Sequence, residues 1–118
     1  MSILVVDDDP ALRELMQWAL RDEGFAVQGA ADGEEALATI AVAQPQLAVL
    51  DMSLPGVDGF GVAHALRARR IPIIVVTADG NAASKAARVG AYRFLRKPFA
   101  MAELVAAVRQ GLAAAQTP

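Results

Sequence analysis

Two patterns of apolar and polar positions alternate along this chain. Short uninterrupted apolar runs are separated by longer stretches in which apolar residues recur at helical spacing. An uninterrupted run is typical of a strand buried on both faces, as in parallel sheets, whereas the longer stretches predict amphipathic helices. Four of the runs lead into a residue that can handle phosphate or metal: Ile3 to Val6 before Asp7 and Asp8, Leu47 to Leu50 before Asp51, Ile73 to Val76 before Thr77, and Phe94 to Leu95 shortly before Lys97.

The predicted helix boundaries coincide with capping residues, glycine and proline. Asp9 and Pro10 suit the N-cap and first position of the first helix, and Gly24 suits its end. Asp32 and Glu35 are spaced like a capping box, which predicts the start of the second helix. The positions expected to face the core are Leu12, Leu15, Met16, Ala19 and Leu20 in the first helix, and Ala36, Leu37, Ile40 and Ala41 in the second.

The complete pattern is (βα)5 in a single domain of residues 1–118. Strands are expected near 3–6, 26–30, 47–50, 73–76 and 92–95, and helices near 10–23, 33–43, 60–69, 82–89 and 101–114. Strands that alternate with helices through short loops indicate the α/β class, a doubly wound parallel five-stranded sheet with right-handed crossovers. In such sheets the ligand crevice lies beyond the carboxyl ends of the strands, so the polar residues there are expected to converge.

Composition narrows the range of partners. The net charge is −2 and 20% of residues are charged, so no overall basic field attracts nucleic acid or an anionic membrane. Cysteine is absent, which excludes disulfides, thiolate catalysis and cysteine-ligated metal. No apolar stretch approaches the ~18 residues of a membrane span. We expect a soluble, cytoplasmic protein that binds neither nucleic acid nor membrane directly.

The acidic residues at the strand ends predict a divalent cation site. If Asp7, Asp8 and Asp51 meet, their carboxylates repel one another unless a cation lies between them. Oxygen ligands without His or Cys favour Mg²⁺, or Mn²⁺, over zinc. Lys97 would add one more positive charge, and the pocket would then suit a transferring phosphoryl group.

Each of the other polar positions has a chemical role in this prediction. Asp51 is the best candidate for a nucleophile, because a carboxylate can form an acyl phosphate and the loop after it leaves room for attack. Thr77 would donate its hydroxyl to a phosphoryl oxygen, Ala78 would leave space beside it, and Lys97 would supply a flexible charge.

These motifs together resemble the receiver domain of response regulators, the phosphoacceptor part of two-component signalling. The matching segments are ILVVDDDP at 3–10, LAVLDMSLPGVDG at 47–59, PIIVVTA at 72–78 and RKPF at 96–99. The resemblance implies a flavodoxin-like receiver fold with strand order 2-1-3-4-5, as in chemotaxis receivers. It also implies that Asp51 accepts phosphate from a histidine kinase or a histidine phosphotransfer protein. Mg²⁺ would be held by Asp8, Asp51 and the carbonyl of Ser53, with Asp7 acting through water.

The same resemblance implies a phosphorylation switch rather than an enzyme acting on other molecules. Thr77 and an aromatic residue on the last strand would change rotamer together. That aromatic residue is Phe94, where receivers commonly have Tyr. We expect that, without this hydroxyl, phosphorylation changes the output face less strongly, or that partners recognise the change differently. The fourth helix, last strand and last helix would form the output face, with a homodimer through it on phosphorylation as one outcome. Ser53 and Asp79 would set the phosphate lifetime, and the bond before Pro98 would be cis.

Two other functions compete with the switch. A haloacid-dehalogenase-type Mg²⁺ phosphatase would use Asp7 as its nucleophile, but Pro10 and Ala11 do not complete the usual motif of that family. A flavodoxin-like FMN binder needs a phosphate-cradling loop after the first strand, where the acidic residues 7–9 would repel phosphate. The sequence does not identify the kinase, the stimulus, the output target or the oligomeric state. It leaves open a free-standing regulator, a phosphorelay intermediate and an excised domain.

Overall fold

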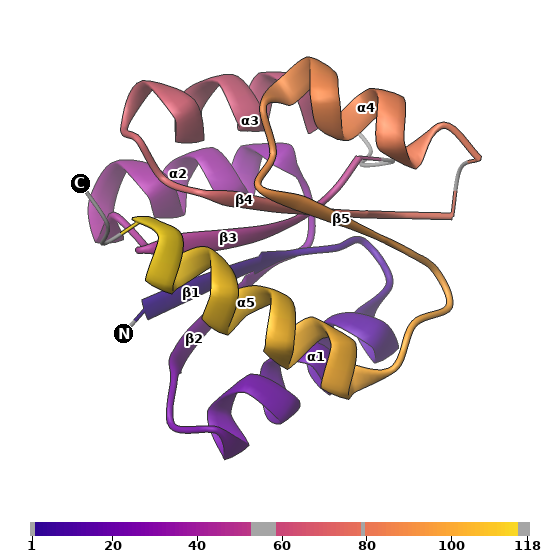
Figure 1. The fold of residues 1–118 in the computed structure, drawn as a ribbon. Coiled ribbons are helices and arrows are strands. Elements are labelled where there is room, and N and C mark those ends of the chain that lie inside the picture. Colours follow the sequence, from indigo (N-terminus) through magenta and orange to yellow (C-terminus); the bar gives the residue numbers. More distant parts are fainter. Residues whose placement is uncertain (1, 53–58, 79, 116–118) are drawn as a thin grey trace.

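The computed structural model describes residues 2–52, 59–78 and 80–115, and strands and helices alternate throughout them (Figure 1). This confirms the (βα)5 prediction. The strands are β1 (Ser2–Val6), β2 (Ala26–Ala30), β3 (Leu47–Asp51), β4 (Ile73–Thr77) and β5 (Arg93–Arg96). The helices are α1 (Pro10–Asp22), α2 (Gly33–Ala43), α3 (Gly59–Ala68), α4 (Ala82–Val89) and α5 (Met101–Ala115).

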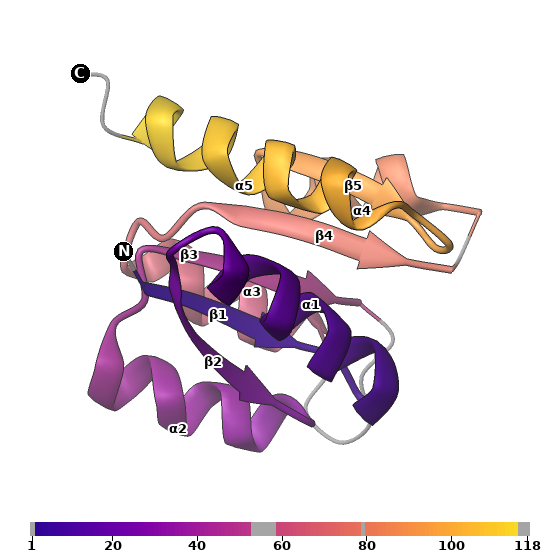
Figure 2. The same cartoon turned by 90° about the horizontal axis from the view of Figure 1, so that it is seen from below.

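The five strands form one parallel sheet in the order β2-β1-β3-β4-β5, as predicted (Figure 2). Val6 on β1 lies opposite Leu50 on β3, and Asp51 lies opposite Val76 on β4. The register therefore brings the carboxyl ends of these strands to the same edge. Any side chain directly after β1, β3, β4 or β5 is placed at that edge.

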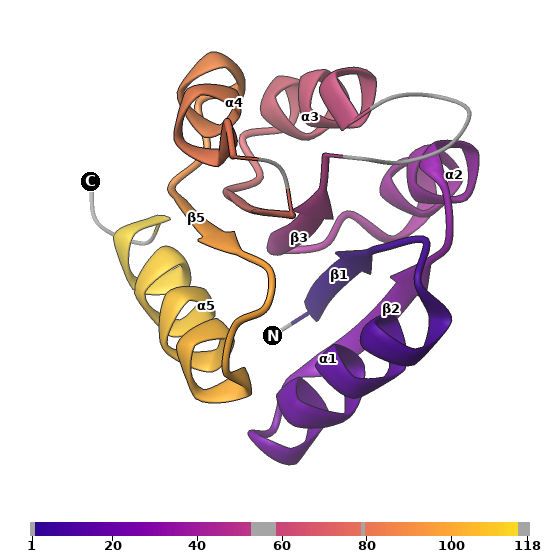
Figure 3. The ribbon, with the colours of Figure 1, turned by 90° about the vertical axis from the view of Figure 1, so that its right-hand side faces the viewer.

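Helices cover both faces of the sheet (Figure 3). Helices α1 and α5 lie on one face, and α2, α3 and α4 lie on the other. Alternate residues of a strand point to opposite faces, so Leu4 and Val6 belong to one core cluster while Ile3 and Val5 belong to the other. Burial on both sides explains why the strands are uninterrupted apolar runs. No helix in the described part of the chain is long and apolar enough to cross a membrane.

Two residues expected in the core are exposed. The side chain of Leu15 is 48% exposed, whereas Met16 and Leu20 are fully buried. Ala41 is also exposed, next to the buried Ile40. The prediction was wrong because each outer helix meets the sheet along a narrow stripe, and the residue beside a buried position lies about 100° around the helix from it. The strand β5 begins one residue later than predicted, and Tyr92 is 43% exposed at its start.

Candidate functional site

Three carboxylates meet where β1 and β3 end. Asp7 follows the last residue of β1, and Asp51 is the last residue of the neighbouring β3. Asp8 is the next residue after Asp7, and one oxygen from each of the three side chains lies within 4.8 Å of the others. Asp7 and Asp51 are buried, whereas Asp8 is exposed. The structure therefore brings together the acids that the sequence placed at the strand ends.

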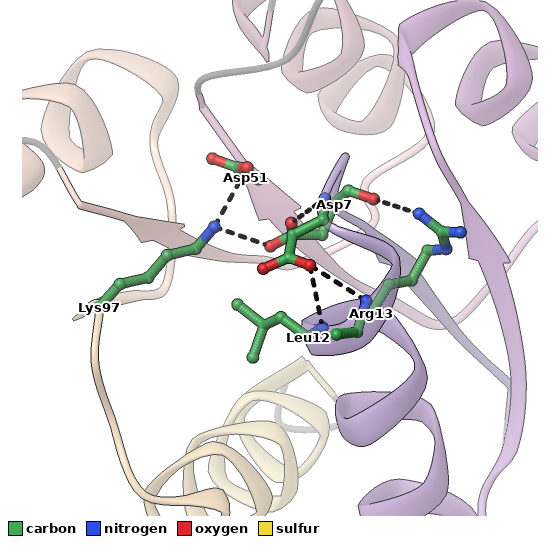
Figure 4. A network of polar contacts seen from close by, with 7 residues as sticks. Asp7, Leu12, Arg13, Asp51 and Lys97 are labelled. Carbon is green, nitrogen blue, oxygen red and sulfur yellow. Dashed lines mark hydrogen bonds and ion pairs between the residues drawn. The ribbon is translucent and has the colours of Figure 1, made fainter.

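Lys97 reaches this cluster from the end of β5 (Figure 4). Its Nζ atom lies 2.9 Å from Asp7 Oδ2 and 3.3 Å from Asp51 Oδ2. The lysine backbone is attached to the adjacent strand, because its N–H donates to the Thr77 carbonyl at 2.9 Å. The peptide bond between Lys97 and Pro98 is cis, as the resemblance implies. The backbone of Lys97 is thus held against β4, while its flexible side chain reaches the carboxylates.

The two carboxylates raise the pKa of Lys97. Partial burial by itself lowers the pKa of the ammonium group, because the charged form loses hydration. The close contact of the ammonium with Asp7 and the negative charges of Asp51 and Asp7 together outweigh that effect, so the net shift is upward. Lys97 is therefore a permanent positive charge at neutral pH.

The position of Asp7 is fixed by contacts on several sides. Its N–H donates to the Ala30 carbonyl at 3.1 Å, and its own carbonyl accepts from Arg13 Nη1 at 2.8 Å. Its Oδ1 atom accepts from the Asp9 N–H at 2.9 Å. Its Oδ2 atom is buried and, among the described residues, has the ion pair with Lys97 but no aligned hydrogen bond. Asp7 thus presents one oxygen with incomplete coordination to the cluster.

These residues fit a divalent metal ion. Three carboxylates carry three negative charges, and the ammonium of Lys97 balances only one of them, so a 2+ ion would neutralise the cluster. All the donors are oxygens, which Mg²⁺ and Mn²⁺ prefer. The best evidence for such an ion is the close approach of the three carboxylates, because oxygens within 4.8 Å of one another repel unless a cation lies between them. Ser53, the expected carbonyl ligand, lies outside the described residues.

Thr77 lies on the other side of Asp51. It is the last residue of β4, which is the neighbour of β3, and its side chain is fully buried. The next residue, Ala78, is exposed. The sheet order therefore places Asp51 between the acids that follow β1 and the hydroxyl of Thr77 on β4. Lys97, which follows β5, contacts Asp7 and Asp51.

Phe94, the expected switch residue, does not lie in the cluster. It pairs with Val75 on β4, two residues before Thr77, and its side chain is 37% exposed. Asp79, expected beside the phosphate, lies outside the described residues. Sequence reasoning placed Asp9 correctly as the N-cap of α1, where its side chain accepts from the N–H groups of Ala11 and Leu12. It missed Arg13, whose only signal was its position one turn into that helix.

Comparisons with known proteins agree with this geometry. The family model described as "Response regulator receiver domain" matches residues 3–109. The response regulator MprA of Mycobacterium avium is 43% identical over 113 residues, which cover 92% of this chain and 50% of that protein. The DNA-binding response regulator MtrA of Mycolicibacterium smegmatis is 42% identical, with 93% and 50% covered. The chain thus spans about half the length of these curated relatives.

Solved structures give the same result. The crystal structure of the receiver domain of NtrX from Brucella abortus matches with a TM-score of 0.86 and 36% sequence identity. The match covers 94% of this chain and 98% of that one. A CheY-like receiver domain from Methanospirillum hungatei matches with a TM-score of 0.89 and 28% identity over 98% of this chain and 95% of the other.

Proposed function

Because the chain belongs to the response-regulator receiver-domain family of two-component systems, we propose that Asp51 accepts a phosphoryl group and thereby acts as a signalling switch. The main support is the central place of Asp51. Its strand lies between the strand that leads to Asp7 and Asp8 and the strand that ends in Thr77. A phosphoryl group on Asp51 would therefore have acidic metal ligands on one side and a hydroxyl donor on the other.

The proposed chemistry needs no external enzyme beyond the phosphoryl donor. A carboxylate oxygen of Asp51 would form a bond to phosphorus while the bond from phosphorus to the donor nitrogen of a phosphohistidine breaks. The leaving imidazole nitrogen keeps the electron pair. Lys97 would stabilise the negative charge on the phosphoryl oxygens, and Thr77 would donate its hydroxyl to one of them. Hydrolysis of the acyl phosphate then returns the switch to its starting state.

We assign Mg²⁺, with Mn²⁺ as a substitute, to Asp7, Asp8 and Asp51, and expect the carbonyl of Ser53 to complete the protein ligands. A bound divalent ion would supply charge neutralisation for the phosphoryl oxygens. Asp7 would hold its place through the contacts of its backbone with Ala30 and Arg13. Ser53 and Asp79 are proposed to control the lifetime of the acyl phosphate.

The signal would leave the site through Thr77 and Phe94. Phosphorylation adds negative charge and acceptor oxygens at Asp51, which would attract the Thr77 hydroxyl. Phe94 lies on β5 with its ring partly exposed, so a change in the packing of that ring would alter the face formed by α4, β5 and α5. This face is the proposed output surface. A phosphorylation-dependent homodimer is one candidate for what binds there.

The proposed phosphoryl donor is a histidine kinase or a histidine phosphotransfer protein in the cytoplasm. We propose that this chain does not itself bind nucleic acid, although MtrA is described as a DNA-binding response regulator. The comparisons give no support to the phosphatase alternative, in which Asp7 would be the nucleophile.

The first prediction concerns the phosphoacceptor. The protein incubated with acetyl phosphate and Mg²⁺ is expected to gain one phosphoryl group by intact-mass spectrometry, and to gain none when EDTA is present. Asp51→Asn should abolish the gain because an amide is a far poorer nucleophile.

Asp9→Asn is the matched control for that experiment. It makes the same chemical change beside the cluster, at an exposed helix cap where Asn is equally suitable. It should leave phosphorylation intact. Phosphorylation of Asp51→Asn to the normal extent would refute the proposed function.

A further inference from the structure

Asp8 differs from the other two acids of the cluster in how it is held. Asp7 and Asp51 are buried, whereas Asp8 is exposed and lies between β1 and α1, outside both elements. Among the described residues, none forms an ion pair or a hydrogen bond with the Asp8 side chain. Its carboxylate nevertheless has an oxygen within 4.8 Å of oxygens from the other two acids. The backbone that carries Asp8 must therefore set its position.

Arg13 holds that backbone on both sides of Asp8. Its Nη1 atom donates to the Asp7 carbonyl at 2.8 Å, and Figure 4 shows the guanidinium directed to this oxygen. The backbone N–H of Arg13 donates to the Asp9 carbonyl at 2.9 Å. A third bond, from the Asp9 N–H to Asp7 Oδ1 at 2.9 Å, closes the same short loop. One residue of α1 is thus bonded to the chain immediately before and immediately after Asp8.

Arg21 makes an equivalent contact at the other end of the same helix. It lies in the last turn of α1, and its Nη2 atom donates to the Val27 carbonyl at 2.9 Å. Both arginines therefore join α1 to a backbone carbonyl through a bond of similar length. Val27 belongs to β2 and not to the acidic cluster. Of the two arginines, Arg13 alone is bonded to the chain that carries the acids.

We propose that Arg13 is a positioning residue for the divalent cation, because it holds residues 7–9 in the conformation that brings Asp8 to the other two acids. The inference rests on the proposed function, which assigns the cation to this cluster. A site whose ligands are already in place need not order them when the cation binds, so its affinity is higher. Groups that orient metal ligands typically contribute about 10–100-fold in metal affinity.

The positive charge of Arg13 would act on the same equilibrium in the opposite direction. A guanidinium near the cluster repels a divalent cation, so its removal would strengthen cation binding if charge alone mattered. Loss of a bond that positions a ligand would weaken cation binding. The sign of the change in affinity therefore distinguishes the two roles.

The test is calorimetric titration of the whole chain with MgCl₂. Arg13→Met removes the charge and the hydrogen bond but keeps a long side chain, and its affinity should be about tenfold lower. Arg13→Lys keeps the charge and an N–H donor, and it should restore most of the affinity. Arg21→Met is the matched control, because it loses the same charge and an equivalent hydrogen bond. Its affinity should equal that of the natural protein.

Backbone motion provides a second measurement, which needs no metal. The NMR order parameters of the Asp8 and Asp9 amides should fall in Arg13→Met and stay unchanged in Arg21→Met. Each Met variant loses a single side-chain hydrogen bond, which is too little to unfold the protein, and circular dichroism checks that both are folded.

Three results would overturn the inference. These are an affinity of Arg13→Met equal to or above that of the natural protein, equal losses in Arg13→Met and Arg21→Met, and no recovery of affinity in Arg13→Lys. Failure of the proposed function gives a different result, in which the natural protein takes up no Mg²⁺. The order parameters then decide the role of Arg13. Lower values in Arg13→Met alone would support it, and unchanged values would contradict it.

Discussion

Asp7 and Asp51 each follow a buried strand, but their surroundings give them different roles. Asp7 is fixed by hydrogen bonds from its backbone and from one carboxylate oxygen, while its other oxygen faces Lys97. Asp51 lies on the central strand, between the acids of one neighbour and Thr77 of the other. The surroundings therefore favour Asp7 as a fixed metal ligand and Asp51 as the group that reacts.

The second prediction follows from that division. Asp7→Asn should weaken Mg²⁺ binding by about 10–100-fold, since loss of one ligand should cost at least as much as loss of a group that supports a ligand. Asp9→Asn should leave the affinity unchanged. The measurement is calorimetric titration of each protein with MgCl₂. Equal affinity in Asp7→Asn and the natural protein would remove Asp7 from the metal site.

Phe94 tests the switch at the same scale. We predict that Phe94→Tyr changes how strongly phosphorylation alters the affinity of the output face, because a tyrosine would restore the hydroxyl that receivers commonly have there. The affinity of self-association is compared by sedimentation with and without acetyl phosphate and Mg²⁺ for both proteins. Equal phosphorylation kinetics and equal affinities would show that the missing hydroxyl has no effect.

At the scale of the elements, most features of the fold were predictable from local pattern. Apolar runs identified the strands because both faces of the sheet are buried, and Asp9, Asp32 and Gly24 marked helix ends correctly. The side-chain orientations on α1 and α2 were less predictable. Leu15 and Ala41 satisfy the helical period but lie beyond the stripe that contacts the sheet, and only the width of that contact decides their exposure.

The third helix provides a prediction about stability. A Cβ atom on Gly59, at the start of α3, would lie 2.9 Å from the Cα atom of Met52, which is backbone and cannot move cheaply. Gly59→Ala should therefore lower the free energy of unfolding by about 1–3 kcal/mol. Gly80→Ala is the control, because a Cβ there meets nothing within 4 Å.

Urea denaturation measures both variants. Gly59→Ala should lower the midpoint at an unchanged m-value, and Gly80→Ala should stay within about 0.5 kcal/mol of the natural protein. Equal midpoints for the two variants would show that the contact with Met52 relaxes without cost.

At the scale of the whole molecule, the convergence of the site depends on strand order. The sequence placed Asp7, Asp8, Asp51, Thr77 and Lys97 at strand ends, but only a parallel sheet in the order β2-β1-β3-β4-β5 makes those ends neighbours. That order came from resemblance, because local pattern does not determine which strands pair. Contacts that depend on exact packing, such as Arg13 with the Asp7 carbonyl, could not be predicted in this way.

The overall charge was also misleading when taken as a single number. A net charge of −2 gave no reason to expect an uneven distribution, yet the segment 59–102 contains eight of the eleven Lys and Arg residues and only one of the thirteen acids. The acidic site lies at the carboxyl ends of the strands, whereas α4 carries Lys85 and Arg88 and β5 carries Arg93 and Arg96. The molecule thus separates the surface that would receive phosphate from the surface that would report it.

The position of the phosphoryl group tests the central claim most directly. The protein is phosphorylated with acetyl phosphate and Mg²⁺ and then treated with borohydride, which reduces an acyl phosphate to a stable alcohol that tandem mass spectrometry can locate. We expect the reduced side chain at Asp51 and an unmodified Asp7. A reduced side chain at Asp7, or none at Asp51, would contradict the proposed role of Asp51.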